Sequence, residues 1–280
     1  MAIEIKVYKA SAGARWFKAG LDVFQAQPFI FMFMYLFIAV IGLVGLIAPV
    51  LKIPAALATP FLMAGLYSAA LRRQQGQKVA FADILNVFSQ KGRRIGLFRV
   101  GLYQMGAALL MGMLASVLFA DVISVMTQPD LDPQTAMQQL AESFSFGSLA
   151  LFLVVLSVYL CAFAFAVPLV YFGNHTSILG VLKASLMAFY HNVGAMTVYG
   201  LILGGLMLVC AFLSFIPLLV VMPICYISLF IAFQAMFMPD LHRSQQADGT
   251  SGITPQSIDA EHKQDNKEHN SSGSNGRFDA

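Results

Sequence analysis

Charged residues are scarce in this chain of 280 residues, where Asp, Glu, Lys and Arg together make up 11%. Soluble proteins use about 25% of these residues to keep their surfaces in water. Hydrophobic residues, in contrast, reach 58%. The shortage of charge excludes an ordinary water-covered domain, and the composition indicates that lipid is the solvent.

Cysteine is nearly absent, and no group of residues has the spacing of a metal site. The three cysteines, Cys161, Cys210 and Cys225, all fall in apolar stretches, where a thiol behaves as a small hydrophobic side chain. This excludes a disulfide framework. We also find no nucleophile beside a base and no carboxylate cluster that would hold a metal. The sequence therefore predicts no cofactor and no catalytic residues.

Charge is missing altogether from several long stretches, each of which reaches the roughly 20 residues that a membrane-spanning helix requires. We predict an all-α fold, a polytopic transmembrane helical bundle at residues 15–240. A cytoplasmic N-terminal segment at 1–14 precedes it, and a polar tail at 241–280, expected to be disordered, follows. The six spanning helices are expected at about residues 28–51, 53–71, 100–120, 146–172, 193–213 and 216–238.

The distribution of Lys and Arg predicts the orientation of this bundle. These residues gather before the first helix and between the second and third, whereas residues 121–142 carry Asp and Glu without a Lys or Arg. Cytoplasmic loops retain Lys and Arg, so both termini are expected on the cytoplasmic side. The net charge of +3 is therefore a topology signal, and we expect no nucleic-acid partner.

Three segments that precede the first, third and fifth helices repeat an apolar pattern at positions i, i+4 and i+7. Polar residues occupy the opposite face, so each segment is predicted to be a short amphipathic helix in the membrane interface. We take Trp16, Phe24, Phe88 and Phe189 as candidate interfacial anchors. The three apolar sets are Phe17, Leu21, Phe24; Phe81, Leu85, Phe88; and Leu182, Leu186, Phe189.

The second, fourth and sixth helices repeat as well, because each carries one proline: Pro60, Pro168 and Pro223. A proline inside a helix frees a carbonyl and bends the axis, which makes these residues candidate kinks or functional hinges. The chain is thus predicted to contain three parallel repeats, each an amphipathic helix followed by a two-helix hairpin.

Two surface features have a structural and a functional interpretation. The basic residues Lys91, Arg93, Arg94 and Arg99 are candidate contacts for anionic lipid headgroups or a protein partner, or they serve only to set topology. Small residues four apart predict close helix packing within the bundle or, alternatively, between subunits. They are Ala108, Gly112 and Ser116, and Gly200 and Gly204.

The segments Lys18-Ala19-Gly20-Leu21-Asp22-Val23-Phe24 and Lys183-Ala184-Ser185-Leu186-Met187-Ala188-Phe189, each followed by a spanning helix and a helix with one proline, carry a family resemblance. Over about residues 10–240 the chain resembles uncharacterised six-helix inner-membrane proteins of proteobacteria. These are distantly similar to the membrane domains fused to some glycerophosphodiester phosphodiesterases. The resemblance implies a bacterial inner-membrane location and supplies no catalytic residues.

Two functions remain open from the sequence. The first is a non-enzymatic membrane protein whose basic cytoplasmic face engages anionic lipid or a partner. The alternative is a permease or lipid-handling channel with a site inside the bundle, and an enzyme comes third. A shared cavity lined by polar side chains would favour the alternative, and a solidly packed interior would favour the first.

Overall fold

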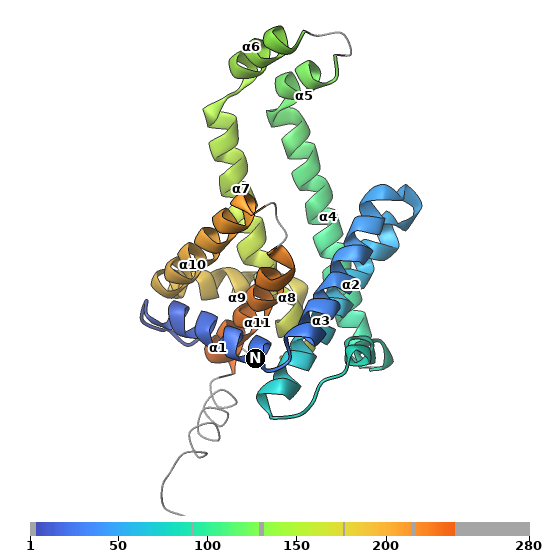
Figure 1. Ribbon diagram of the computed structural model, residues 1–280, viewed down its shortest axis with the longest axis vertical. Coiled ribbons are helices and arrows are strands. Elements are labelled where there is room, and N and C mark those ends of the chain that lie inside the picture. Colours follow the sequence, from blue (N-terminus) through green and yellow to red (C-terminus); the bar gives the residue numbers. More distant parts are fainter. Residues whose placement is uncertain (1–3, 91, 129–131, 176, 214–216, 239–280) are drawn as a thin grey trace, which may run out of the picture. The chain divides into compact units, whose positions relative to one another are not determined.

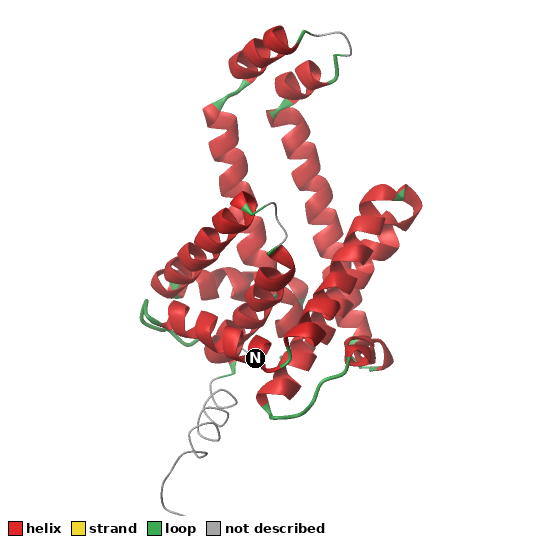
Figure 2. Cartoon of the chain, in the orientation of Figure 1, coloured by secondary structure: helices red, strands yellow, loops and turns green. Residues whose placement is uncertain are grey.

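The computed structural model describes residues 4–90, 92–128, 132–175, 177–213 and 217–238. The predicted tail lies outside the described residues. Within the described ranges the chain forms helices joined by turns and loops, without strands (Figure 2). The helices are α1 (Ala12–Ala26), α2 (Pro28–Ile47), η1 (Pro49–Leu51), α3 (Lys52–Gln74), η2 (Phe81–Ser89), α4 (Arg94–Leu118), α5 (Ala120–Met126), α6 (Pro133–Ser143), α7 (Phe146–Ala164), α8 (Ala166–Tyr171), α9 (Ile178–His191), α10 (Val193–Phe212) and α11 (Leu218–Phe237).

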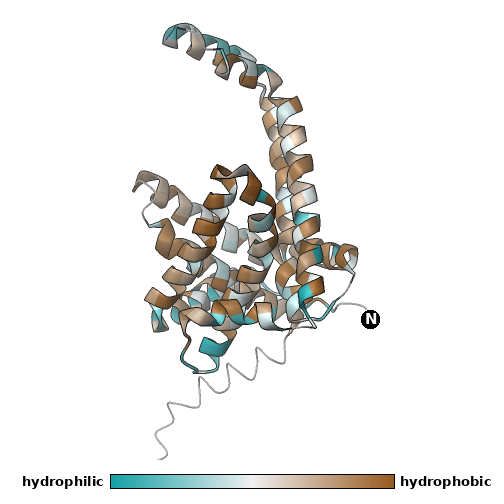
Figure 3. Cartoon of the chain, turned by 90° about the vertical axis from the view of Figure 1, so that its right-hand side faces the viewer, coloured by the Kyte–Doolittle hydropathy of each residue, from teal (hydrophilic) through white to brown (hydrophobic). Residues whose placement is uncertain are grey.

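The six predicted spanning helices are confirmed by the described helices that are long and apolar enough to cross a bilayer. They are α2, α3, α4, the pair α7 and α8, α10 and α11. Apolar residues cover their surfaces, whereas hydrophilic residues concentrate at α6 and in the loops (Figure 3). The chain therefore has the all-α polytopic architecture that its charge-free stretches predict.

The fourth span is interrupted at Phe165, between α7 and α8. Pro168 follows three residues later, and its ring prevents a helical bond to the carbonyl of Ala164, the last residue of α7. The other two prolines differ, because α3 and α11 continue through Pro60 and Pro223 as single helices. Kinks at those two positions remain a prediction.

A short helix precedes each pair of spans: α1, η2 and α9 (Figure 1). The second is a 3₁₀ helix. Each short helix packs on the second span of the preceding unit, because η2 lies on α3 and α9 lies on α7 and α8. The first short helix, α1, packs on α11, the last span of the chain. The three units therefore close into a ring, and we call the end of the bundle that holds these helices the short-helix end.

A Gln or Asn follows each short helix, and its side-chain carboxamide forms hydrogen bonds with the part of the chain that leads into the next short helix. Gln27 follows α1, and its side chain exchanges two hydrogen bonds with the backbone of Val79, two residues before η2. Gln90 follows η2 and accepts a 2.9 Å hydrogen bond from the hydroxyl of Tyr171, which ends α8 before α9. These two contacts join the first unit to the second and the second to the third.

Asn192 makes the equivalent contact after α9 and closes the ring. Its side-chain oxygen accepts a 2.8 Å hydrogen bond from the backbone of Tyr8, and its side-chain nitrogen donates to the carbonyl of Lys6 at 3.1 Å. The same residue is 1% exposed. The N-terminal segment before α1 is therefore held against the third unit.

Small residues allow two of the short helices to approach the spans closely. A Cβ added to Gly20 of α1 would overlap Ser228 of α11, and one added to Gly65 of α3 would overlap Ile84 of η2. In the first pair the short helix supplies the glycine, and in the second pair the span supplies it. Close backbone approach of this kind is typical of helix packing in membranes.

The buried faces of the short helices differ slightly from the apolar sets that the sequence indicates. In α1 the buried side chains include Trp16 and Phe24. In η2 they are Ile84 and Val87, whereas Phe88 is 38% exposed. Most of the large apolar side chains in these sets lie at the edge of the contact between short helix and span. Smaller residues lie where the two helices approach most closely.

The expectation that the spaced small residues pack inside the bundle is wrong for three of them. A Cβ added to Gly112, Gly200 or Gly204 would meet no atom of the described chain within 4 Å. Gly112 lies in the half of α4 that extends, together with α7, toward α5 and α6 (Figure 1). These faces are exposed to lipid in the single chain.

Candidate functional site

The described residues of the predicted basic cluster have different surroundings. Arg93 donates a hydrogen bond to the carbonyl of Tyr171, and its guanidinium lies 5.0 Å from the centre of that ring. It therefore joins the beginning of α4 to the end of α8. Arg94 and Arg99 are exposed. Lys91 lies outside the described residues.

The candidate interfacial anchors contact protein. Trp16 and Phe24 are 3% and 4% exposed, so both belong to the core. Phe88 stacks on Phe61 of α3 with 5.0 Å between the ring centres, and the ring centres of Phe189 and Phe165 lie 5.3 Å apart. The depth of these residues in a bilayer stays a prediction, but their side chains dock α1, η2 and α9 onto the bundle.

The short-helix end of the bundle is closed by packed aromatic rings, which we call the aromatic cluster. Phe230 of α11 lies 5.0 Å from Phe172 and 5.9 Å from Phe233, measured between ring centres. Beside these rings the side-chain amides of Gln74 and Gln234 exchange hydrogen bonds of 3.1 and 3.0 Å between α3 and α11. Gln234 is completely buried, and this reciprocal pair satisfies both amides.

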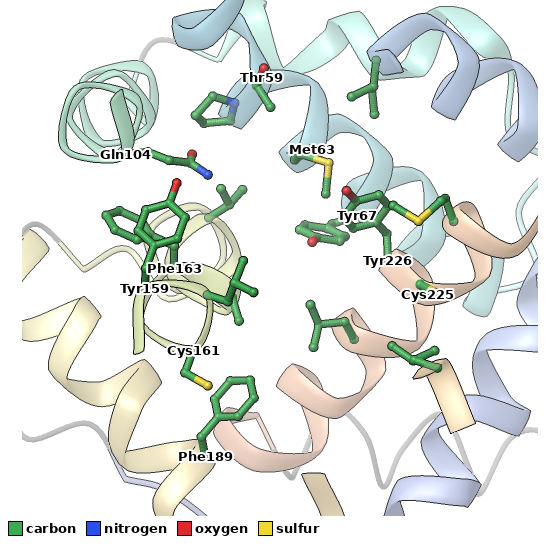
Figure 4. Close-up of a pocket in the computed structure, with 18 of the residues that line it drawn as sticks. Thr59, Met63, Tyr67, Gln104, Tyr159, Cys161, Phe163, Phe189, Cys225 and Tyr226 are labelled. Atoms are coloured by element: carbon green, nitrogen blue, oxygen red, sulfur yellow. The ribbon is translucent and has the colours of Figure 1, made fainter. Parts of the chain in front are cut away.

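A cavity of about 580 Å³ lies among the spans of all three units. Its walls come from α2, α3, α4, α7, α10 and α11, with single residues of α8 and α9. Figure 4 shows Gln104 and Tyr159 together on one wall and Tyr67, Tyr226 and Cys225 on the opposite wall. No charged side chain lines the cavity, and the described walls are mainly apolar.

Several polar groups of the cavity wall already have partners within the protein. The hydroxyl of Thr59 donates to the carbonyl of Ala55 at 2.9 Å, as is common for a hydroxyl inside a helix. The hydroxyl of Tyr199 lies 2.9 Å from both the carbonyl of Cys225 and the hydroxyl of Ser228. These bonds join α10 to α11.

Tyr67 is different, because its side chain is 3% exposed and its hydroxyl takes part in none of the hydrogen bonds between described residues. Its ring stacks on Phe230 at 5.1 Å, so the ring is fixed where the aromatic cluster meets the cavity. The hydroxyl is not among the fully buried unpaired polar atoms of the described residues, so a molecule in the cavity can reach it. A hydrogen bond formed there would contribute about 0.5–1.5 kcal/mol. Tyr67 is thus a suitable contact for a polar group within the cavity.

The side chains of this site are of kinds that can bind a ligand. Across the described ranges no three His, Cys, Asp or Glu side chains gather closely enough to hold a metal ion. The cavity wall offers hydroxyls, one carboxamide and two thiols among apolar side chains. Such a wall can hold an apolar molecule and orient one uncharged polar group on it.

Sequence reasoning missed these residues, although a weak signal exists. Each of five spans contributes one Tyr or Gln to the cavity wall: Tyr67, Gln104, Tyr159, Tyr199 and Tyr226. A search restricted to Asp, Glu, Lys, Arg and His does not find them. Their convergence on one cavity depends on how the spans pack.

A family model described as "Predicted integral membrane protein (DUF2189)" matches residues 47–172. This chain is a polytopic integral membrane protein. The match covers less than half of it, from the end of α2 to the end of α8, and it supports an uncharacterised membrane family. No curated protein and no solved structure matches. The resemblance to membrane domains of glycerophosphodiester phosphodiesterases is therefore without support from these comparisons.

Proposed function

We propose that the chain is a non-enzymatic membrane protein that binds a lipid-like molecule with an uncharged polar group in its central cavity. The observation that carries this proposal is the cavity of about 580 Å³, whose wall includes Tyr67 with a hydroxyl that makes no hydrogen bond to the described residues. Pockets for small ligands occupy about 300–1,000 Å³ and have mainly apolar walls with a few polar groups. The lipid-handling alternative is thereby favoured over a solidly packed scaffold.

The class of ligand follows from the wall. A charged group placed there would lose its hydration without gaining an opposite charge, which is costly. An acyl chain, in contrast, gains from every apolar contact. Its polar end needs one or two hydrogen bonds, which either Tyr67 on one wall or Gln104 on the opposite wall can supply (Figure 4).

The location and orientation belong to the same proposal. The family resemblance supports the inner membrane of a bacterium. The Lys and Arg before α2 and between α3 and α4 support a cytoplasmic short-helix end with both termini on that side. The aromatic cluster would then close the cavity toward the cytoplasm.

Binding is tested with a monoacylglycerol, which has one acyl chain and an uncharged headgroup. Ala164 lines the cavity, so Ala164→Trp fills it. The control is Ala108→Trp, an equal change at an exposed position of α4 outside the cavity wall. In detergent, added monoacylglycerol should raise the melting temperature of the native protein and of the control by several degrees and leave that of Ala164→Trp unchanged. An equal rise in all three proteins would contradict the proposal.

A second candidate function concerns the exposed Arg94 and Arg99, which lie near the start of α4 at the short-helix end. Basic side chains at a membrane surface attract anionic headgroups by about 1 kcal/mol each. Arg94→Gln with Arg99→Gln should therefore reduce the phosphatidylglycerol retained by the protein in native mass spectrometry. Lys52→Gln, at the opposite end of the bundle, is the control and should retain it. Equal retention in both variants would remove this candidate.

A further inference from the structure

The ring of three units contains three junctions between neighbouring units, and one of them differs from the other two. At one junction α3 packs along α4, where a Cβ added to Gly101 would lie 3.4 Å from Pro60. At another α11 packs along α2, and the rings of Tyr35 and Tyr226 lie 6.1 Å apart there. Direct packing of two spans closes both junctions.

At the third junction α7 and α10 lack this packing, although the structure describes both helices in full. Helix α9 fills only the short-helix end, where it lies against α7 and α8. The cavity wall nevertheless includes Tyr159 and Leu160 of α7 together with Leu203 and Met207 of α10. The cavity therefore reaches the interval between these two spans.

Leu160 lies at the mouth of the cavity. It lines the cavity and is also 57% exposed, whereas every other residue of the cavity wall is buried or partly buried. The residue lies near the middle of the span Phe146–Tyr171. An opening at this depth faces the hydrocarbon of the bilayer, since a span of this length crosses the whole apolar layer.

We propose that the junction between α7 and α10 is a lateral portal through which the acyl chain of a bilayer lipid enters the cavity. This inference rests on the proposed function, because a portal requires a cavity that binds an amphiphile. The occupant is an acyl chain because the mouth opens at mid-span, its walls are apolar and no charge lines the route. Leu160 is the side chain that narrows the mouth.

The test measures the rate at which a lipid reaches the cavity. Full-length protein in phosphatidylcholine nanodiscs is mixed with vesicles that contain a monoacylglycerol with a diazirine in its acyl chain. Samples are illuminated after increasing times, and cross-linked residues are identified by mass spectrometry. Cross-links on Met63 and Tyr67 report arrival, because both side chains line the cavity and are buried.

Two substitutions at the mouth should change this rate in opposite directions. Leu160→Trp should slow the appearance of cavity cross-links several-fold without changing the final yield, and Leu160→Ala should accelerate it. The matched control is Leu153→Trp, two turns earlier on α7, where Leu153 is 49% exposed and does not line the cavity. This control should behave as the native protein. That result would show that Leu160→Trp slows cross-linking because it narrows the mouth and not because it adds an aromatic ring.

The outcomes separate the portal from the binding function. Cavity cross-links that form at one rate in the native protein and both Leu160 variants would overturn the portal and leave the proposed function intact. Cross-links confined to the outer surface of the native protein would overturn both. Slowing by Leu153→Trp to the same extent as by Leu160→Trp would also overturn the portal.

Discussion

At the scale of single residues, the space beside a side chain determines its role more than its chemical type does. Gly65 and Gly112 both lie inside spans, yet one is covered by η2 and the other by no described atom. Their sequence contexts are alike, since each stands among apolar and small neighbours. The sequence therefore predicted close packing at Gly112, and only the structure shows that it belongs at Gly65 and Gly20.

This difference predicts opposite effects of the same substitution. Gly65→Ala places a methyl group into the backbone of Ile84, and overpacking of this kind costs about 1–3 kcal/mol. Gly112→Ala adds a methyl group in open space and improves helix propensity. Thermal unfolding in detergent should show a lowered midpoint for Gly65→Ala and an unchanged or raised midpoint for Gly112→Ala. Equal midpoints would mean that η2 does not dock at Gly65.

The hydroxyl of Tyr67 gives a second prediction at this scale. Tyr67→Phe keeps the ring that stacks on Phe230 and removes only the hydroxyl, which makes no hydrogen bond to the described residues. Loss of one hydrogen bond to the ligand, about 0.5–1.5 kcal/mol, should weaken monoacylglycerol binding roughly 2- to 10-fold without lowering stability. Tyr199→Phe is the comparison, because it breaks the bonds to Cys225 and Ser228 and should lower stability. A stability loss in Tyr67→Phe that equals that of Tyr199→Phe would contradict a ligand contact.

At the scale of elements, the three carboxamides that follow the short helices hold the units together. Gln27, Gln90 and Asn192 stand at the same place in each unit, just before the first spanning helix. Sequence comparison could find the apolar pattern of the short helices, because that pattern is local. It could not identify the carboxamides, since their partners lie far away in the sequence and differ in each unit.

The contact of Asn192 predicts how the N-terminal segment is held. Asn192→Leu has a similar volume but loses the hydrogen bonds to Tyr8 and Lys6, so the segment should detach from the third unit. Trypsin should then cleave after Lys9 faster than in the native protein, as followed by mass spectrometry. The control is Asn86→Leu, which alters an exposed amide that donates a hydrogen bond to Asp83 within η2. Unchanged cleavage in Asn192→Leu would show that the ring does not depend on this contact.

At the scale of the whole molecule, the spanning helices could be predicted because a charge-free run is a property of the sequence itself. Arrangement of the spans could not be predicted in this way, since every face of an apolar helix is compatible with lipid. The closed ring, the cavity and the unpacked junction between α7 and α10 all depend on that arrangement. The sequence feature that accompanies the cavity is the presence of Tyr and Gln side chains within otherwise apolar spans.

The orientation of the ring is a separate prediction at this scale. Reporter fusions after Gln75 and Ser177 should show a cytoplasmic location, because the Lys and Arg of the chain lie at that end. Fusions after Val50 and Thr127 should show the opposite side. Enzymatic reporters active on only one side of the membrane make the measurement. A cytoplasmic signal at Thr127 would mean that the orientation is reversed and that the aromatic cluster lies on the outer side.

The central claim is that the spans enclose a cavity that holds a lipid-like molecule. An electron cryomicroscopy map of the full-length protein in lipid nanodiscs tests it most directly. We expect elongated density beside Tyr67 and Gln104 that reaches the interval between α7 and α10. A map in which α7 packs along α10 and protein side chains fill the volume would contradict the claim.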